Sequence, residues 1–271
     1  MSISASVLLN TAIDAAQKAG QILLRAAPNV SQLTIEQKSL NDFVSEVDRK
    51  AEQSIVNIIQ DSFPSHRVIG EEFGEQGEQG AEVVWYVDPL DGTTNFLRSI
   101  PHYCVSIAAY HQQLPLVAVV FDPVKQEMFT AVADAGAYLN GAKISVASSR
   151  SLHGTLLATG VPYSGQYLDR LPVFLHTMQE LLGEQTSGIR RLGSAALDLA
   201  YVAAGRYDGY WEAGLKPWDI AAGILLVQEA GGTCSDLLGE QNQLKCGDTL
   251  AANAKVHKEM LAITKSHYSQ A

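Results

Sequence analysis

The stretch that decides the fold covers residues 83–95 and reads VVWYVDPLDGTTN. Its first five residues are apolar or aromatic, which is typical of a buried strand. The strand runs directly into Asp88 and Asp91, two carboxylates three residues apart. With the Leu90 carbonyl between them, they supply the oxygen ligands that hard divalent cations prefer. Gly92-Thr93 would add backbone N–H groups for a phosphate if a short helix begins there.

The chain before this stretch predicts a pair of helices. Apolar residues recur at helical spacing from Val7 to Leu23, and Pro28 indicates that the first helix ends before it. After a polar stretch, Ser45 and Asp48 resemble an N-cap and its acidic partner at the start of a second helix. Residues 68–69 form a short apolar segment, which leads into Gly70-Glu71-Glu72 and a loop rich in Gly, Glu and Gln.

The segments that follow indicate more strands. Strands are predicted at residues 103–110, 116–121 and 127–132, and Asn140-Gly141 is a hairpin signal before a strand at 143–146. The first half therefore predicts a helix pair followed by a largely antiparallel sheet.

The second half alternates strands and helices. Strands are predicted at residues 155–159, 188–191, 207–211 and 250–252, and helices at 168–182, 194–204, 219–230 and 256–265. No internal repeat or long linker separates the halves. We therefore predict an α+β fold in a single domain over residues 1–271, with two lobes, 1–150 and 151–271, that share one core.

The composition limits the partners that this chain can bind. Lys plus Arg number 19 and Asp plus Glu number 29, so the formal charge is 19 − 29 = −10. Direct nucleic-acid binding and binding to an anionic membrane both need a basic field, so neither is expected. An anionic substrate would also be repelled, and bound cations would have to reverse the local charge.

Cysteine usage and hydropathy predict a cytoplasmic protein. The three cysteines form no C-x-x-C pair and are far apart in the sequence, which favours a reducing compartment. The N-terminal apolar pattern contains Asp14 and Lys18 and lacks a basic n-region, so it resembles an amphipathic helix more than a signal peptide. No stretch approaches the ~20 apolar residues that a membrane-spanning helix needs.

Further carboxylates follow other apolar segments. Glu71 and Glu72 come after residues 68–69, and Asp219 stands at the head of an apolar helix. Taken singly, these residues are better explained by a solvated loop, a helix N-cap and an Asp-rich turn. Together with Asp88 and Asp91 they favour a centre that binds more than one Mg²⁺ ion.

The strings G-E-E, D-P-L-D-G-T-T-N and W-D-I-A-A-G occur in this order and resemble the three signature motifs of the lithium-sensitive inositol monophosphatase superfamily. The segments NDFV at 41–44 and GSAALDLA at 193–200 are similar to the bacterial inositol-1-monophosphatase branch. The resemblance runs to about residue 255. It implies a layered α-β-α-β-α sandwich of the sugar-phosphatase type, one catalytic domain and a homodimer.

The resemblance also assigns roles to residues. It implies Mg²⁺ ligands at Glu71, Asp88, the Leu90 carbonyl, Asp91 and Asp219, with Glu71 also counted among the catalytic residues. Thr93 and Asp48 would orient and deprotonate the attacking water in the hydrolysis of myo-inositol-1-phosphate, without a covalent intermediate. The substrate contacts that it implies are Asp91, Gly92, Thr93, Gly193, Ser194, Ala195, Glu212 and Asp219. Glu212 matters for specificity, because a fixed carboxylate that accepts hydroxyl bonds disfavours substrates that lack them.

Several alternatives stay open at the level of substrate. Lys216 occupies a position where animal family members carry histidine, and it could tune the affinity for a second anionic group. Fructose-1,6-bisphosphatase, histidinol phosphatase and nucleotide 3′-phosphatase activities therefore compete with the inositol phosphatase assignment. Phosphatases of the haloacid dehalogenase type are rejected because they require D-x-D, whereas this chain has D-x-x-D.

The sequence also bears on protein partners and on other cofactors. The resemblance to the bacterial branch also implies a contact with transcription machinery, and Arg190-Arg191 could serve such a partner surface. Ordinary surface charge, or Arg190 bridging to the active site or a dimer mate, is the favoured explanation of this pair. The seven histidines show no zinc-ligand spacing, and no G-x-G-x-x-G or P-loop occurs. No zinc or organic cofactor is expected.

Overall fold

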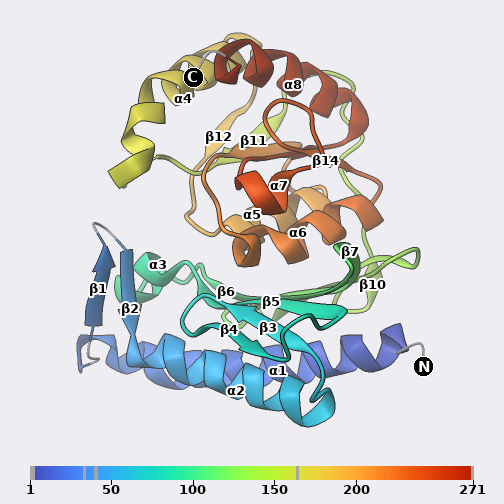
Figure 1. The fold of residues 1–271 in the computed structure, drawn as a ribbon. Helices are drawn as coiled ribbons and strands as arrows, with labels where there is room; N and C mark the ends of the chain where they lie inside the picture. The colour runs from blue at the N-terminus through green and yellow to red at the C-terminus, as the bar shows by residue number, and fades with distance from the viewer. Residues whose placement is uncertain (1–3, 33–34, 40–41, 163–164, 270–271) are drawn as a thin grey trace.

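The computed structural model describes residues 4–32, 35–39, 42–162 and 165–269. The elements stack in the order helix, sheet, helix, sheet, helix (Figure 1). An eight-stranded sheet lies between the first and middle helical layers, and a five-stranded sheet lies between the middle and last ones. This is the layered α+β architecture that the sequence predicts.

The first layer consists of the helices α1 (Ala5–Ala26) and α2 (Glu46–Ser62). The predicted capping box is present, because the Ser45 hydroxyl accepts a bond from the Val47 N–H at 3.2 Å and the Ser45 N–H donates to Asp48 Oδ2 at 3.0 Å. The polar stretch between the helices contains a hairpin that was not predicted, β1 (Ile35–Ser39) and β2 (Asp42–Ser45). Its sequence is too polar to show the alternation typical of a half-buried strand.

The first sheet has the order β10-β9-β8-β7-β6-β5-β3-β4 and is antiparallel except for the pair β3 and β5. The strands are β3 (Arg67–Gly70), β4 (Gly74–Gly77), β5 (Val83–Asp91), β6 (Cys104–His111), β7 (Leu114–Asp122), β8 (Glu127–Val132), β9 (Gly136–Leu139) and β10 (Ala142–Lys143). The largely antiparallel sheet is therefore confirmed. The loop predicted after Glu72 contains β4, which was missed.

The prediction of a strand at residues 143–146 is wrong. Asn140-Gly141 does turn the chain, with φ of 49° and 80°, but β10 ends at Lys143. Beyond it, Val146 donates its N–H to the Ala230 carbonyl at 3.1 Å, at the end of the middle-layer helix α6 (Pro217–Glu229). The chain has left the sheet by this point to cross toward the second one.

The second sheet has the order β12-β11-β13-β15-β14, with β11 parallel to both of its neighbours. Its strands are β11 (Leu156–Thr159), β12 (Gly188–Arg190), β13 (Gly209–Glu212), β14 (Thr233–Ser235) and β15 (Thr249–Ala252). The helices around it are α4 (Leu171–Gly183), α5 (Ala195–Ala203), α6, α7 (Gln243–Cys246) and α8 (Ala254–Tyr268). Among the described residues of this half, the short elements β14 and α7 and the start of a 3-10 helix at Gly165–Arg170 were not predicted.

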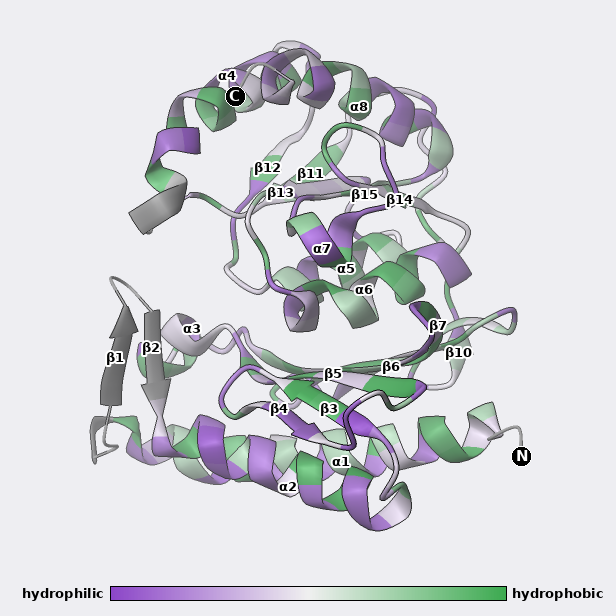
Figure 2. Ribbon diagram, viewed as in Figure 1, coloured by the Kyte–Doolittle hydropathy of each residue, from purple (hydrophilic) through white to green (hydrophobic). Residues whose placement is uncertain are grey.

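The helices α5 and α6 form the middle layer and pack against both sheets (Figure 1). One buried cluster joins their side chains to those of β6, β7 and β8, and the Tyr110 hydroxyl donates to the Ala221 carbonyl at 2.9 Å. In Figure 2 these two helices are largely green, whereas α1 and α2 carry broad purple bands. None of the described helices is long and apolar enough to span a bilayer. The first sheet ends at Lys143 and the second begins at Leu156, and the division into lobes at residue 150 stays an interpretation.

Candidate functional site

The predicted carboxylates at the end of β5 stand on an irregular part of the strand. Asp88 pairs with Ser106 and Asp91 with Cys104, so the register shifts between the two aspartates. A bulge of this kind bends a strand and redirects its side chains. Asp88 is only 2% exposed, and its Oδ1 accepts a bond from the Leu90 N–H at 2.9 Å.

Backbone donors from the middle layer fix the neighbouring carboxylates. Asp91 Oδ2 accepts bonds from the Ala196 N–H and the Ser194 hydroxyl, both at 2.7 Å, at the start of α5. Asp219 lies in the first turn of α6, where its Oδ2 accepts a bond from the Lys216 N–H at 2.7 Å. The first turns of two helices therefore orient these side chains before any ligand binds.

The charges of this group act on one another. Burial raises the pKa of Asp88 well above its ordinary value, and repulsion by Glu71, Asp91 and Asp219 raises it further. Burial also raises the pKa of Asp219, with added repulsion from Asp91 and Glu71. The pKa of Asp91 rises to about 6, chiefly through burial. The structure therefore brings four predicted ligands within electrostatic reach of one another.

The donor set fits a hard divalent cation. The side chains of Glu71, Asp88, Asp91 and Asp219 and the buried Leu90 carbonyl all offer oxygen, which Mg²⁺ prefers. In the described part of the chain, no three or more His, Cys, Asp or Glu side chains already meet the geometry of a metal site. Like charges at short range repel one another, so such a set is expected to close only around a cation.

Glu52 supports the Glu71 segment, and sequence reasoning missed it. This side chain of α2 is fully buried, and its oxygens accept the Glu72 N–H at 2.7 Å and the Phe73 N–H at 2.9 Å. A Cβ at Gly70 would lie 2.2 Å from Glu52 Oε1, so only glycine fits there. The sequence did contain one sign of this role, since Glu52 is a charged residue that follows Ala51 on an otherwise apolar helix face.

The hydroxyl of Thr93 lies between two acceptors. Thr93 Oγ1 is 3.1 Å from the Leu90 carbonyl and 3.4 Å from Asp48 Oδ1. Asp48 is buried, and its other oxygen accepts bonds from the N–H and the hydroxyl of Ser45. The short helix α3 (Thr93–Leu97) begins here, as the sequence allowed, with Gly92 at its N-cap in the left-handed conformation (φ 100°). A side chain at Gly92 would press on the His102 carbonyl, 3.0 Å from an added Cβ.

The predicted substrate contacts come from the second half of the chain. Gly193 (φ 84°), Ser194 and Ala195 form the approach to α5, and Glu212 ends β13. Burial raises the pKa of Glu212 to about 7, and Asp91 is among the charges that raise it. Glu212 therefore lies within electrostatic reach of the β5 carboxylates.

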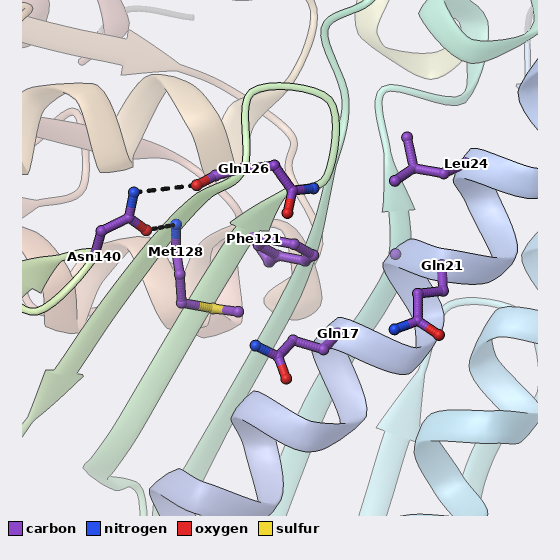
Figure 3. A pocket seen from close by; sticks show the side chains of 8 residues that line it. Gln17, Gln21, Leu24, Phe121, Gln126, Met128 and Asn140 are labelled. Carbon is purple, nitrogen blue, oxygen red and sulfur yellow. Dashed lines mark hydrogen bonds between the residues drawn. The ribbon is translucent and has the colours of Figure 1, made fainter.

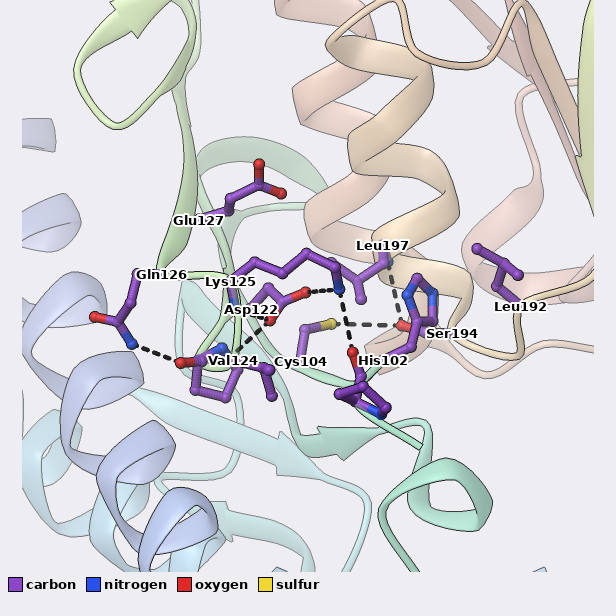
Figure 4. Close-up of polar contacts among 12 residues, drawn as sticks. His102, Cys104, Asp122, Val124, Lys125, Gln126, Glu127, Leu192, Ser194 and Leu197 are labelled. Atoms are coloured by element: carbon purple, nitrogen blue, oxygen red, sulfur yellow. Dashed lines mark hydrogen bonds and ion pairs between the residues drawn. The ribbon is translucent and has the colours of Figure 1, made fainter. Parts of the chain in front are cut away.

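Asn95 and Cys104 also join the two halves at this place. Asn95 Nδ2 donates to the His102 and Leu192 carbonyls, both at 2.8 Å, and so ties α3 to the segment before α5. Cys104 on β6 lies 3.6 Å from the Ser194 hydroxyl, and Figure 4 shows these two residues meeting between the sheet and α5. Asn95 belongs to the quoted motif, but only the fold reveals its structural role.

The described chain also forms a cavity of about 480 Å³ away from the carboxylates. Figure 3 shows its position between α1 and the strands β7 and β8. Its lining consists of Gln17, Gly20, Gln21, Leu24, Phe121, Gln126, Met128 and Asn140. The lining contains no carboxylate, so the predicted chemistry does not belong there.

Comparisons with known proteins agree with this geometry. The model of the inositol monophosphatase family matches residues 4–270. The chain is 47% identical to Nus factor SuhB of Pseudomonas aeruginosa over 262 residues, 96% of each protein. It is 46% identical to Nus factor SuhB of Escherichia coli strain K12, over 97% of this chain and 98% of that protein.

Solved structures show the same likeness. The extragenic suppressor protein suhB from Bartonella henselae superposes with a TM-score of 0.92 at 39% identity, over 96% of this chain and 98% of that one. The inositol monophosphatase of Anabaena gives a TM-score of 0.86 at 35% identity, over 97% of this chain and 96% of that one. The predicted family and fold are both confirmed. On its sequence, its layers and these relatives, the chain belongs to the inositol monophosphatase family.

Proposed function

We propose that this protein hydrolyses the phosphate monoester of a small polyol, with myo-inositol-1-phosphate as substrate and Mg²⁺ as cofactor. Membership of the family supports a phosphatase. The observation that carries the proposal is the carboxylate group formed by buried Asp88 and half-buried Glu71, Asp91 and Asp219. Burial raises the pKa of Asp88 most, and repulsion by the other three raises it further. Buried like charges are costly to the fold, which is consistent with selection for a ligand that neutralises them.

Glu71, Asp88, Asp91, Asp219 and the Leu90 carbonyl would hold the Mg²⁺ ions. When bound, Mg²⁺ neutralises phosphate charge, stabilises the leaving alkoxide and lowers the pKa of water. The protein supplies a rigid frame, because each aspartate already accepts a backbone N–H bond.

Thr93 and Asp48 would handle the proton of the attacking water. With its own proton directed to Asp48 Oδ1, the Thr93 oxygen can accept a hydrogen bond from water and orient it for in-line attack. Asp48 is fixed by Ser45 and can take up the proton. The backbone N–H groups at Gly92 and Thr93 would contact the phosphate. Water attacks phosphorus directly, and the polyol leaves without a covalent intermediate.

The substrate hydroxyls would face the wall formed by the second half of the chain. Gly193, Ser194 and Ala195 offer polar groups at the start of α5, and Glu212 offers a half-buried carboxylate. Asp91 and Asp219 would contact both metal and substrate. A polyol can donate further hydroxyl bonds to the Glu212 carboxylate, whereas a simple aryl phosphate has no hydroxyls to donate.

A panel of substrates tests this assignment on the purified protein with Mg²⁺. We expect the highest kcat/KM on inositol-1-phosphate, compared with fructose-1,6-bisphosphate, histidinol phosphate and phosphoadenosine phosphate. A clear preference for one of the other three would replace the inositol assignment, and Lys216 would then be examined as the contact to a second anionic group. Absence of hydrolysis with every substrate would overturn the phosphatase proposal itself.

A second role is supported by the relatives. The Nus factor SuhB of Pseudomonas aeruginosa is 47% identical to this chain, and Arg190 and Arg191 are exposed in the segment before α5. We propose that the chain also contacts a transcription factor. Pull-down with purified RNA polymerase factors should retain the protein, and retention should weaken in an Arg190→Ala/Arg191→Ala variant. No retention would leave catalysis as its only proposed role.

A further inference from the structure

The carboxylate of Glu212 is fixed by a buried phenol on its own strand. The Tyr210 hydroxyl donates to Glu212 Oε2 at 2.6 Å, and Tyr210 is fully buried in the described structure. The two residues are two positions apart on β13, so their side chains share one face of the sheet. Burial raises the pKa of the phenol well above its ordinary value, so the hydroxyl stays protonated and can donate.

A second strand closes the other side of this carboxylate. β11 runs parallel to β13 with Thr159 opposite Trp211, which brings Gly160 beside Glu212. The Gly160 backbone hydrogen-bonds to the Glu212 carboxylate. A Cβ at Gly160 would lie 1.8 Å from Glu212 Oε1, so no side chain fits there without moving the carboxylate. The Thr159 hydroxyl donates to the Trp211 carbonyl at 2.7 Å and ties the two strands together at this level.

We propose that Tyr210 and Gly160 are positioning residues for polyol recognition, which fix the Glu212 carboxylate in the orientation that accepts substrate hydroxyl bonds. The inference rests on the proposed function, since it needs Glu212 to contact the polyol. Its physical basis is preorganisation: a carboxylate already fixed by two donors loses little conformational freedom when the substrate binds. Neither residue would touch the phosphate or the metal ligands. Substituting either one should therefore lower kcat/KM only for substrates whose alcohol part carries hydroxyls.

Tyr210→Phe tests the phenol with almost no change of shape. On inositol-1-phosphate we expect roughly a tenfold loss of kcat/KM, mostly through KM, the size expected for one hydrogen bond to a charged group. On 4-nitrophenyl phosphate, which has no polyol hydroxyls, the loss should be several-fold smaller. The ratio of the two kcat/KM values is therefore the readout, because a general loss of folded protein would leave this ratio unchanged.

Tyr110→Phe is the matched control. Tyr110 is also buried, and its hydroxyl also donates one hydrogen bond, to the Ala221 carbonyl at 2.9 Å. This variant should lower the melting temperature while leaving the ratio of the two substrates at its wild-type value. A fall of the ratio as large as that in Tyr210→Phe would show that any lost core hydroxyl has this effect, and would overturn the proposal.

Gly160→Ala perturbs the same carboxylate from the neighbouring strand β11. It provides a second test of the proposal if Tyr210→Phe folds poorly. It should lower the same ratio by displacing Glu212. In a Glu212→Gln background, each of the two substitutions should change the ratio by less than twofold, because all three act through one contact. Full additivity with Glu212→Gln would contradict the proposal.

The outcomes separate this inference from the function on which it rests. A wild-type protein inactive on inositol-1-phosphate but active on 4-nitrophenyl phosphate overturns the polyol assignment, and the inference with it. A wild-type protein active on both, with an unchanged ratio in Tyr210→Phe and Gly160→Ala, overturns the inference alone. The inference is supported if the ratio of the two kcat/KM values falls in both Tyr210→Phe and Gly160→Ala but not in Tyr110→Phe.

Discussion

Asp91 contacts both halves of the molecule with one side chain. It ends β5 of the first sheet, and its Oδ2 accepts bonds from Ser194 and Ala196 at the start of α5. Burial raises its pKa to about 6, so in the metal-free protein the charged form is disfavoured. A residue in this position affects metal binding, substrate contact and the junction between the halves together.

Asp91→Asn should abolish turnover while preserving the fold. The amide keeps the size of the side chain and an acceptor for the Ser194 hydroxyl and the Ala196 N–H, but it removes the negative charge that a cation needs. We expect kcat to fall by at least about 10²-fold. Because burial disfavours the charge, the melting temperature of the metal-free variant should equal or exceed that of the wild type.

Asp122→Asn provides the comparison for that substitution. Asp122 is fully buried, whereas Asp91 is half-buried. Asp122 accepts bonds from the Val124 N–H, the Lys125 N–H and the Lys125 ammonium (Figure 4), and it is not among the proposed metal ligands. Its loss should lower stability and leave kcat near the wild-type value. Near-native turnover in Asp91→Asn would remove Asp91 from the proposed site.

Thr93→Ala should lower kcat more than it raises KM. The hydroxyl lies within reach of Asp48 and the Leu90 carbonyl, and a positioned proton transfer contributes roughly 10²–10⁴-fold. Thr93→Ser keeps the hydroxyl and should restore most of the rate. Steady-state kinetics of the three proteins measure this, and a serine variant as slow as the alanine one would show that the methyl group, not the hydroxyl, matters.

Single residues were predictable where a motif places them at the end of an element. Asp88, Asp91 and Asp219 could be named because each follows or opens an apolar segment. Tyr210 and Glu52 could not, because their importance depends on contacts that only the folded chain creates. Glu52 meets the Glu72 N–H across 20 positions of sequence, which no local pattern encodes.

At the scale of elements, α2 positions the Glu71 segment through a buried carboxylate. Glu52 accepts two backbone N–H bonds from the turn after β3, and Gly70 leaves room for it. A loop with three glutamates and glycines nearby would otherwise be free to sample many conformations. The helix pair therefore does more than cover the sheet.

Glu52→Gln should weaken Mg²⁺ binding without touching a proposed ligand. The amide keeps the size but can accept through only one oxygen, so one of the Glu72 and Phe73 N–H groups loses its partner. We expect the Mg²⁺ concentration for half-maximal activity to rise several-fold, with kcat at saturating Mg²⁺ changed much less. Glu46→Gln, on the exposed side of the same helix, should match the wild type. An unchanged Mg²⁺ dependence in Glu52→Gln would contradict the positioning role.

Elements whose apolar residues recur with a clear helical or strand period were predicted well. Elements without such a pattern were not. The Ser45–Asp48 capping box, the long strands β5 to β8 and the helices α5, α6 and α8 agree with the sequence pattern. The hairpin of β1 and β2 was missed because polar residues dominate it, and part of the segment NDFV lies outside the described residues, including Asn41. Residues 143–146 look like a strand, but long-range contact with Ala230 decides their path.

At the scale of the whole molecule, charge is the dominant constraint. The chain carries a formal charge of −10, and its proposed site gathers further buried negative charge. A phosphate monoester dianion would approach this surface against a repulsive field. We therefore expect cations to accompany the proposed reaction.

Activity should depend strictly on Mg²⁺. Without it, repulsion between the carboxylates and the substrate opposes binding. Exhaustive chelation should remove turnover and added Mg²⁺ should restore it, while lithium should inhibit at low Mg²⁺, as the family resemblance implies. Full turnover after chelation would refute the metal dependence.

The stability of the metal-free protein should fall as pH rises between about 5 and 7. Glu212 has a folded pKa of about 7, above the ordinary value of about 4.3, so the folded state binds its proton more tightly than the unfolded chain does. This contribution is fully present below pH 4 and is lost as pH rises through 7. Burial lowers the pKa of His66 and His102, which produces the opposite slope below about pH 6.5.

The difference in pH-dependent stability between the wild type and Glu212→Gln measures the contribution of the Glu212 carboxylate, because both proteins contain the same histidines. The wild type should lose more melting temperature than the variant between pH 5 and pH 7.5 in the presence of chelator. Parallel slopes would show that Glu212 does not titrate in this range.

The chain crosses from the first sheet to the second between β10 and β11, and the two sheets carry different parts of the proposed site. The proposed metal ligands at residues 71–91 depend on the first sheet, and Asp219 joins them from the middle-layer helix α6. Glu212, Tyr210 and Gly160 belong to the second sheet or its edge. Mutations that accumulate around β11 and β13 could therefore change the alcohol that is accepted while the hydrolytic apparatus stays intact. A lineage built on this scaffold can diversify its substrates without first losing its chemistry.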